Sequence, residues 1–136
     1  MAAGETLEIS LRIDWSDLDY YAHVNNVSIA RYLQSARVNF WELSGLTESY
    51  QKFQKGPMLV GTKSDFKNAL TYPGMVRIVS RIVKIGNSSF SIAHHLYDSH
   101  NTLCVESVDT AVCYDFKHHH TIPIPESIRK VMERYS

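Results

Sequence analysis

The stretch that decides the fold is Asp17–Arg37, DLDYYAHVNNVSIARYLQSAR, where a polar segment leads directly into a regular helical pattern. Apolar residues recur at spacings of three and four along one face of this predicted helix: Ile29, Leu33, Ala36, Phe40 and Leu43. Residues that can accept hydrogen bonds from the free N–H groups of the first turn stand at its start: Asn25, Asn26 and Ser28. We predict a long helix that begins near Asn26 and ends near Gly45.

Two reactive side chains, Asp19 and His23, directly precede this helix. The first turn of a helix has unpaired N–H donors and the positive end of the helix dipole, which would polarise a carbonyl oxygen and stabilise an oxyanion. A carboxylate, an imidazole and such a helix start favour acyl transfer or hydrolysis. Two alternatives stay open. The polar residues before the helix can serve as helix caps alone, without any catalytic role. In an extended segment, Asp17 would also point the same way as Asp19 and is a rival base.

Length and charge restrict the classes of protein that this chain can represent. The 136 residues suit one domain, 1–136, and the formal net charge of +0 gives no field that would attract nucleic acid or acidic membranes. We find no signal peptide and no uncharged apolar stretch of about 18 residues that could span a bilayer. We therefore expect a soluble cytoplasmic protein without nucleic-acid or membrane partners.

Alternating apolar residues predict strands both before and after the long helix in the sequence. Five stretches show this pattern or are rich in β-formers: Thr6–Trp15, Met58–Leu70, Met75–Ile85, Phe90–Leu96 and Thr102–Phe116. The last four follow one another through short turns, which predicts an antiparallel meander. A short helical turn at Thr47–Gln54 and a helix at Glu126–Tyr135 complete the pattern. We predict an α+β fold, with one long central helix wrapped by a five-stranded antiparallel sheet.

The histidines and cysteines are not expected to bind metal. Three consecutive residues, His118–His120, cannot all converge on one ion from a regular strand, and no carboxylate is evident to complete a shell, so we predict a solvated loop. His94 and His95 lie on opposite faces of a strand, which favours a satisfied structural histidine. Cys104 and Cys113 would lie roughly 30 Å apart along one strand, so we expect reduced core thiols.

The order of these residues resembles a known family. Arg12, Asp17, Asp19, the run His23-Val24-Asn25-Asn26 and a helix that carries Arg37 are similar to the 4-hydroxybenzoyl-CoA thioesterase branch of the hot-dog-fold acyl-CoA thioesterases. The resemblance implies the hot-dog fold and hydrolysis of an acyl-CoA thioester to a free acid and coenzyme A, without metal or cofactor. It implies that Asp19 is the general base or nucleophile and that the backbone N–H of Asn26 holds the carbonyl oxygen.

The chain departs from the family pattern at three positions. Ala22 stands where a glycine is usual, Ile29 where an aromatic residue is frequent, and Gln34 where a glutamate is common. Without a carboxylate at Gln34, Asp19 must carry the base or nucleophile role. His23 and Asn25 are expected to position water or the loop itself.

Substrate contacts are expected on both sides of the helix start. Tyr20, Tyr21 and Ile29 are candidates to shape the acyl pocket, although an aromatic core role is an equal alternative. The polar run in the second predicted strand supplies three further candidates: Lys63, Ser64 and Lys67. Lys63 or Lys67 would contact coenzyme A phosphates, unless they belong only to an exposed strand face.

Edge strands of so short a sheet predict a homodimer, and the resemblance implies active sites at the dimer interface and assembly into a homotetramer. Two other functions stay open. The changes at Ala22 and Gln34 are compatible with a non-catalytic acyl-CoA-binding module, and His23 is compatible with a hot-dog hydratase or dehydratase. The length and the aliphatic or aromatic character of the acyl group are left open.

Overall fold

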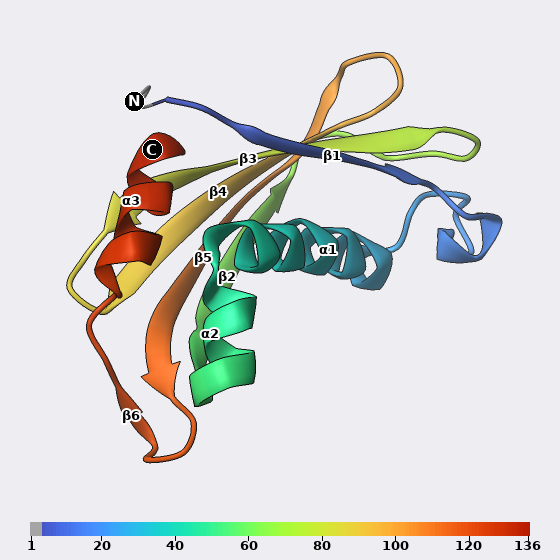
Figure 1. The fold of residues 1–136 in the computed structure, drawn as a ribbon. Helices are drawn as coiled ribbons and strands as arrows, with labels where there is room; N and C mark the ends of the chain where they lie inside the picture. Colours follow the sequence, from blue (N-terminus) through green and yellow to red (C-terminus); the bar gives the residue numbers. More distant parts are fainter. Residues whose placement is uncertain (1–3) are drawn as a thin grey trace.

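The computed structural model describes residues 4–136 as a curved antiparallel sheet wrapped around one long helix (Figure 1). In this part of the chain the helices are α1 (Asn26–Ser44), α2 (Leu46–Phe53) and α3 (Glu126–Arg134), with a 3-10 turn at Trp15–Asp17. The strands are β1 (Leu7–Arg12), β2 (Lys55–Phe66), β3 (Met75–Ile85), β4 (Ser89–Tyr97), β5 (Leu103–Asp115) and β6 (His120–Thr121). The α+β class is confirmed, and the two-residue β6 adds a sixth strand that the sequence pattern does not predict.

Helix α1 has the bounds that its caps predict. The Asn25 side chain accepts a hydrogen bond from the Val27 N–H at 2.8 Å, and Gly45 ends the helix in the left-handed conformation at φ 93°. Most of the predicted apolar face is buried: Ile29, Leu33, Ala36 and Phe40. Leu43 was expected on that face but is 46% exposed, whereas Ser44 beside it is buried.

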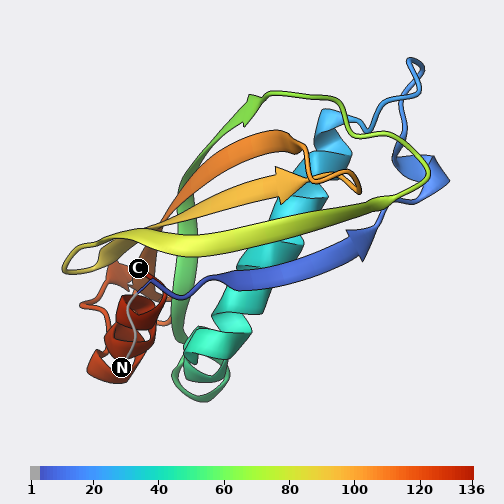
Figure 2. The ribbon, with the colours of Figure 1, turned by 90° about the horizontal axis from the view of Figure 1, so that it is seen from above.

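The sheet has the strand order β1-β3-β4-β5-β2 and bends over α1 (Figure 2). The predicted four-stranded meander is wrong in one respect, because β2 pairs with β5 and not with its sequence neighbour β3. Only β3, β4 and β5 form a meander. The connection between β2 and β3, residues 67–74, is longer than a hairpin turn and carries the chain to the other side of the sheet. Strand β2 is therefore an edge strand.

The ends of two strands differ from the sequence pattern. Strand β2 begins at Lys55 and contains Pro57, which was expected to precede the strand. An edge strand tolerates proline because its outward N–H needs no ladder partner. Strand β1 ends at Arg12, so Trp15 does not continue its apolar face and is 72% exposed on the 3-10 turn.

The core consists of two apolar clusters along α1. One surrounds the first half of the helix and includes Leu33 and Cys104, and the other includes Phe40, Cys113 and Met132 of α3. Both cysteines are buried and free, as predicted. No helix within residues 4–136 has the length and apolar character needed to cross a membrane.

A buried polar cluster joins α1 to the three central strands. Arg37 Nε donates to Asp109 Oδ2 at 2.9 Å, and His94 Nε2 lies 2.8 Å from the same oxygen. The other ring nitrogen of His94 lies 2.7 Å from Ser80 Oγ. Burial alone would raise the pKa of Asp109, but the hydrogen bonds from His94 and Arg37 outweigh it and lower this pKa to about 2. The prediction that His94 is a satisfied structural histidine is confirmed.

Candidate active site

A tight loop between Leu18 and Val24 holds the candidate catalytic side chains. Leu18 and Val24 pair as an isolated antiparallel bridge, and the Asp19 N–H donates to the His23 carbonyl at 2.9 Å. The Ala22 N–H donates back to the Asp19 carbonyl at 3.1 Å, which closes the turn. Ala22 takes a left-handed conformation with φ 62°. Glycine adopts this conformation without steric strain, so the turn favours glycine at this position.

One oxygen of the Asp19 carboxylate is used by the loop and the other is not. Oδ1 accepts hydrogen bonds from the N–H of Tyr21 at 2.8 Å and from the N–H of His23 at 3.4 Å. Among residues 4–136, no protein donor contacts Oδ2. The loop therefore fixes the orientation of this carboxylate and leaves Oδ2 available to water or substrate.

The start of α1 keeps a backbone donor open beside Asp19. Asn26 is the first residue of the helix, so its N–H has no carbonyl one turn earlier to bond to. The Asn25 cap accepts from Val27 instead of Asn26, and in the described chain no loop carbonyl accepts from Asn26. This N–H has the properties needed to polarise a carbonyl oxygen.

Asp17, the rival carboxylate, is committed to structure. Its side chain is 9% exposed, and it accepts hydrogen bonds from Tyr32 Oη at 2.6 Å, Arg31 Nη2 at 2.9 Å and the Asp14 N–H at 3.0 Å. Burial alone would raise the pKa of Asp17, but these hydrogen bonds outweigh it and the pKa lies below its usual value. The expectation that Asp17 and Asp19 point the same way is wrong, because the 3-10 turn interrupts the extended chain.

A groove between α1 and β2 runs away from this loop, and we call it the α1–β2 groove. Its first part is a cavity of about 350 Å³ lined by Asp19, His23, Val24, Asn26, Ile29, Phe66, Lys67, Asn68, Ala69 and Leu70. Its second part, about 320 Å³, is lined by Asn26, Ile29, Ala30, Leu33, Gln34, Arg37, Leu59, Thr62, Ser64 and Phe66. The two parts share Asn26, Ile29 and Phe66, so they form one continuous surface.

The predicted site residues separate into two groups. Asp19, His23, Asn26, Ile29, Ser64 and Lys67 line the groove. Asn25 acts as the helix cap beside it, and Lys63 lies on exposed β2 without lining it. Tyr20 and Tyr21 are 96% and 76% exposed, with their rings in edge-to-face contact outside the groove.

Sequence reasoning missed Phe66, which is 59% exposed at the end of β2 and borders both parts of the groove. The available signal was an aromatic residue within the polar run Lys63–Lys67.

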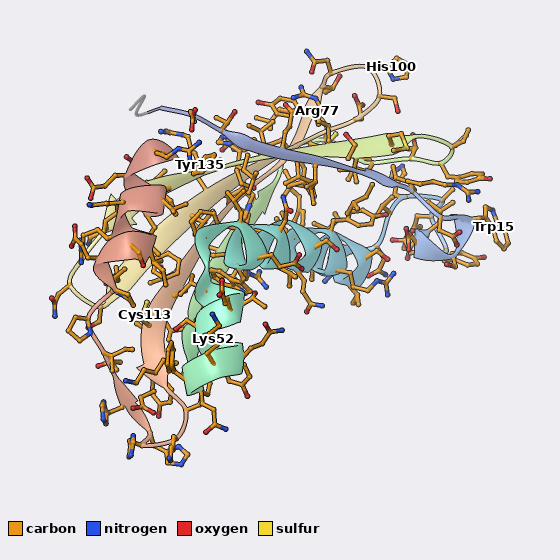
Figure 3. The ribbon with its side chains drawn as sticks, viewed as in Figure 1. Trp15, Lys52, Arg77, His100, Cys113 and Tyr135 are labelled. Carbon is orange, nitrogen blue, oxygen red and sulfur yellow. The ribbon has the colours of Figure 1, made fainter. Side chains whose placement is uncertain are left out.

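A second hollow, about 490 Å³, lies between α2 and α3. Its lining residues Glu48 and Lys52 pair with each other at 2.6 Å. Figure 3 shows Lys52 on α2, away from the loop segment beside Trp15. Of these two surfaces, the α1–β2 groove is the one that brings together Asp19, His23 and the open N–H of Asn26, so it is the candidate active site.

Comparisons with known proteins identify the family and the fold of this chain. Residues 13–132 match a family described as the thioesterase-like superfamily. No curated protein sequence matches the chain.

Solved structures share the fold. A protein from Bacillus stearothermophilus described as a predicted thioesterase is 20% identical, with a TM-score of 0.87 over 96% of both chains. A Staphylococcus aureus protein solved in complex with CoA is 11% identical, with a TM-score of 0.91 over 99% of this chain and 86% of that one. The 1,4-dihydroxy-2-naphthoyl-CoA thioesterase from Synechocystis is 13% identical, with a TM-score of 0.82 over 94% and 96% of the two chains. At these identities the likeness shows the hot-dog fold.

Proposed function

The chain belongs to the thioesterase-like superfamily and is a thioester hydrolase, and we propose that it hydrolyses acyl-CoA in the α1–β2 groove with Asp19 as the reacting carboxylate. One observation carries this proposal. The half-free carboxylate of Asp19 and the open N–H of Asn26 border the same cavity of about 350 Å³. Water and the thioester would yield a carboxylic acid and the thiol of coenzyme A.

In the proposed reaction, the Asn26 N–H polarises the thioester carbonyl while Asp19 acts on its carbon. The dipole of α1 adds to this polarisation and stabilises the tetrahedral oxyanion. The hydrogen bonds from the Tyr21 and His23 N–H groups to Oδ1 hold the carboxylate at the edge of the cavity and leave Oδ2 for the reaction. Asp19 Oδ2 then either takes a proton from the attacking water, or attacks the carbonyl carbon itself. In the second route the C–S bond breaks, the coenzyme A thiolate leaves, and water cleaves the resulting mixed anhydride to the acid and free Asp19.

A single turnover in ¹⁸O-water with enzyme in excess tests for an anhydride that water cleaves at the aspartyl carbon. If Asp19 is a general base, the label enters the released acid directly. If Asp19 is the nucleophile and water cleaves the anhydride at the aspartyl carbon, the label appears in Asp19 and the first acid carries none. Mass spectrometry of the loop peptide and of the acid distinguishes the two results.

The lining of the groove supports a division between acyl group and coenzyme A. Apolar side chains of the second part suit an acyl group that lies along α1: Ile29, Ala30, Leu33 and Leu59. Lys67 borders the first part and is 48% exposed, which suits a contact to a coenzyme A phosphate at the rim. A Staphylococcus aureus protein of the same fold was solved in complex with CoA, which supports an acyl-CoA ligand.

We further propose that the protein acts in the cytoplasm as a homodimer, assembling to a homotetramer, with β2 as the pairing edge. The outer side of β2 has no partner strand among the described residues. Exposed apolar side chains gather on this strand: Leu59, Val60 and Phe66. Pairing of two such edges would cover them and close the α1–β2 groove. Light scattering that finds a stable monomer at micromolar concentration would remove this part of the proposal.

The experiment that tests the function is release of free thiol from a panel of short, medium, long and aromatic acyl-CoAs. The unmodified protein is compared with Asp19→Ala, both shown to be folded by circular dichroism. We expect turnover with at least one substrate class and its loss in Asp19→Ala. Turnover that persists in Asp19→Ala would overturn the assignment of Asp19, and silence of the folded protein across the panel would overturn acyl-CoA hydrolysis.

A further inference from the structure

We propose that Asp115, His118 and His120 form a binding site for a divalent transition-metal ion of the Zn²⁺ class. One potential ligand atom from each of these residues lies within 4.8 Å of the other two. Ligands of a tetrahedral ion lie closer together than this, and a rotation of the two exposed imidazoles would bring their ring nitrogens nearer. The site is independent of the proposed acyl-CoA hydrolysis.

The turn after β5 brings these residues together. Residues 116–119 form the turn, and β6 then folds back so that His120 lies opposite Asp115 in the antiparallel register. The middle histidine, His119, has a left-handed conformation with φ 58° and is not part of the cluster. As expected, the three consecutive histidines do not all converge, because only His118 and His120 belong to the cluster. The expectation that no carboxylate is at hand is wrong, because the turn places Asp115 beside His118.

A hydrogen bond prepares the His120 ring to bind a metal through Nε2. His120 Nδ1 lies 3.0 Å from the Thr121 carbonyl, which can only accept, so Nδ1 carries the proton and Nε2 has a lone pair. His118 Nδ1 lies 2.9 Å from Asp115 Oδ2. The N–H groups of Lys117 and His118 both donate to Asp115 Oδ1 at 3.0 Å, which leaves Oδ2 beside His118 Nδ1, and an ion bound between these two atoms would replace the proton that they share. A carbonyl oxygen on the second ring nitrogen, as at His120, is a usual support of a metal-bound histidine.

The donor set selects the kind of ion. Two imidazoles and one carboxylate suit Zn²⁺, Ni²⁺ or Cu²⁺, whereas Mg²⁺ and Ca²⁺ prefer oxygen donors alone. The two rings are nearly parallel, with centroids 6.2 Å apart and an interplanar angle of 23°, and both face solvent. Water would fill the remaining coordination positions.

The place of the site predicts a structural effect. Figure 1 shows β6 and the turn before it at one end of the molecule, with the loop that leads into α1 at another. A metal held by Asp115 on β5 and His120 on β6 would clamp β6 to the sheet. Binding to the folded state alone raises the melting temperature in proportion to the logarithm of metal concentration.

The test is calorimetric titration of Zn²⁺ into tag-free, metal-stripped protein, for the unmodified chain and for His118→Ala, His120→Ala and His119→Ala. His119→Ala is the matched control, because it removes a histidine of the same turn outside the cluster. We expect one ion per chain, with affinity at least about tenfold lower in His118→Ala and His120→Ala and nearly unchanged in His119→Ala. Absence of one-to-one binding, or an equal loss in all three variants, would overturn the proposal.

Cobalt tests the carboxylate. Co²⁺ bound to the unmodified protein should give visible absorption bands that change in position and intensity in Asp115→Asn. Bands identical in both proteins would overturn the role of Asp115 as a ligand. Because Asp115→Asn also removes hydrogen bonds to the turn, Zn²⁺-induced thermal shifts of His119→Ala and His120→Ala serve as a second measurement. A rise in melting temperature with His119→Ala but not with His120→Ala is expected, and equal rises would contradict the site.

Discussion

Asp17 and Asp19 lie two residues apart in one polar segment, yet the structure uses them in opposite ways. Asp17 is buried and accepts hydrogen bonds from Tyr32, Arg31 and the Asp14 N–H. Asp19 is half-buried, is held only through Oδ1 by its own loop, and borders the groove. The difference shows that a carboxylate becomes available for chemistry when its loop orients it without using both of its oxygens.

The largest expected effect is a loss of catalytic activity, and it distinguishes Asp19 from Asp17. Asp19→Asn keeps the loop acceptor but removes the charge, so we expect kcat/KM for acyl-CoA hydrolysis to fall by about a hundredfold to ten-thousandfold. The melting temperature should change little, because only Oδ1 supports the loop. Steady-state kinetics and thermal unfolding measured on the same preparation check both parts. A comparable loss of activity in Asp98→Asn, a loop carboxylate outside the groove, would indicate that the effect is not specific.

The second effect is on stability. Asp17→Ala leaves the Tyr32 hydroxyl and the Asp14 N–H without their acceptor, so we expect the free energy of unfolding to fall by about 2–4 kcal/mol. The exposed Arg31 partner contributes little of this. Urea denaturation measures the change, and Tyr32→Phe, which removes one of these bonds, should cost about 1 kcal/mol. A smaller loss in Asp17→Ala than in Asp19→Ala would reverse the comparison.

The third effect is a pH dependence. Because the pKa of Asp17 is lower in the folded protein than its ordinary value of 3.8, its charge stabilises the fold above that value, and this contribution is lost as pH falls through the folded pKa. The stability difference between the unmodified protein and Asp17→Asn should therefore be largest near neutral pH and shrink below about pH 4. Urea titrations of both proteins at several pH values check this. A difference that is constant with pH would contradict it.

The smallest effect concerns the loop that orients Asp19. Ala22 has φ 62°, where a side chain costs about 1 kcal/mol and glycine does not. Glycine loses more entropy on folding, so Ala22→Gly should stabilise the protein by only about 0.5 kcal/mol. Thermal unfolding measures the gain, with Ala30→Gly as the control, since glycine inside α1 should destabilise by about 1 kcal/mol. A loss of stability in Ala22→Gly would show that this φ carries no strain.

Local patterns predicted the elements well, while their pairing depended on contacts distant in sequence. The spacing of Ile29, Leu33 and Phe40, with the caps Asn25 and Gly45, was enough to place α1. The pairing of β2 with β5 was not predictable from short turns alone, because the connection at 67–74 resembles any other loop in composition.

The site was predicted to a similar degree. The sequence order from Asp19 to Asn26 identified the loop and the helix start, and both border the groove. The role of Asp17 could not be predicted, because it accepts a hydrogen bond from Tyr32, which lies in the second turn of α1 and is distant from Asp17 in sequence. The contact between Asp115 and His118 likewise depends on the shape of a turn, which could not be deduced from the run of histidines in the sequence.

The chain of hydrogen bonds from Arg37 through Asp109 and His94 to Ser80 has a consequence for how the strands align. Each member belongs to a different element: α1, β5, β4 and β3. If any of these strands slipped by one residue, its polar side chain would point to the opposite face and leave buried partners without hydrogen bonds. Apolar residues alternate similarly in several alignments, but these four polar groups meet in only one. The cluster thus stabilises the observed strand register relative to misaligned sheets.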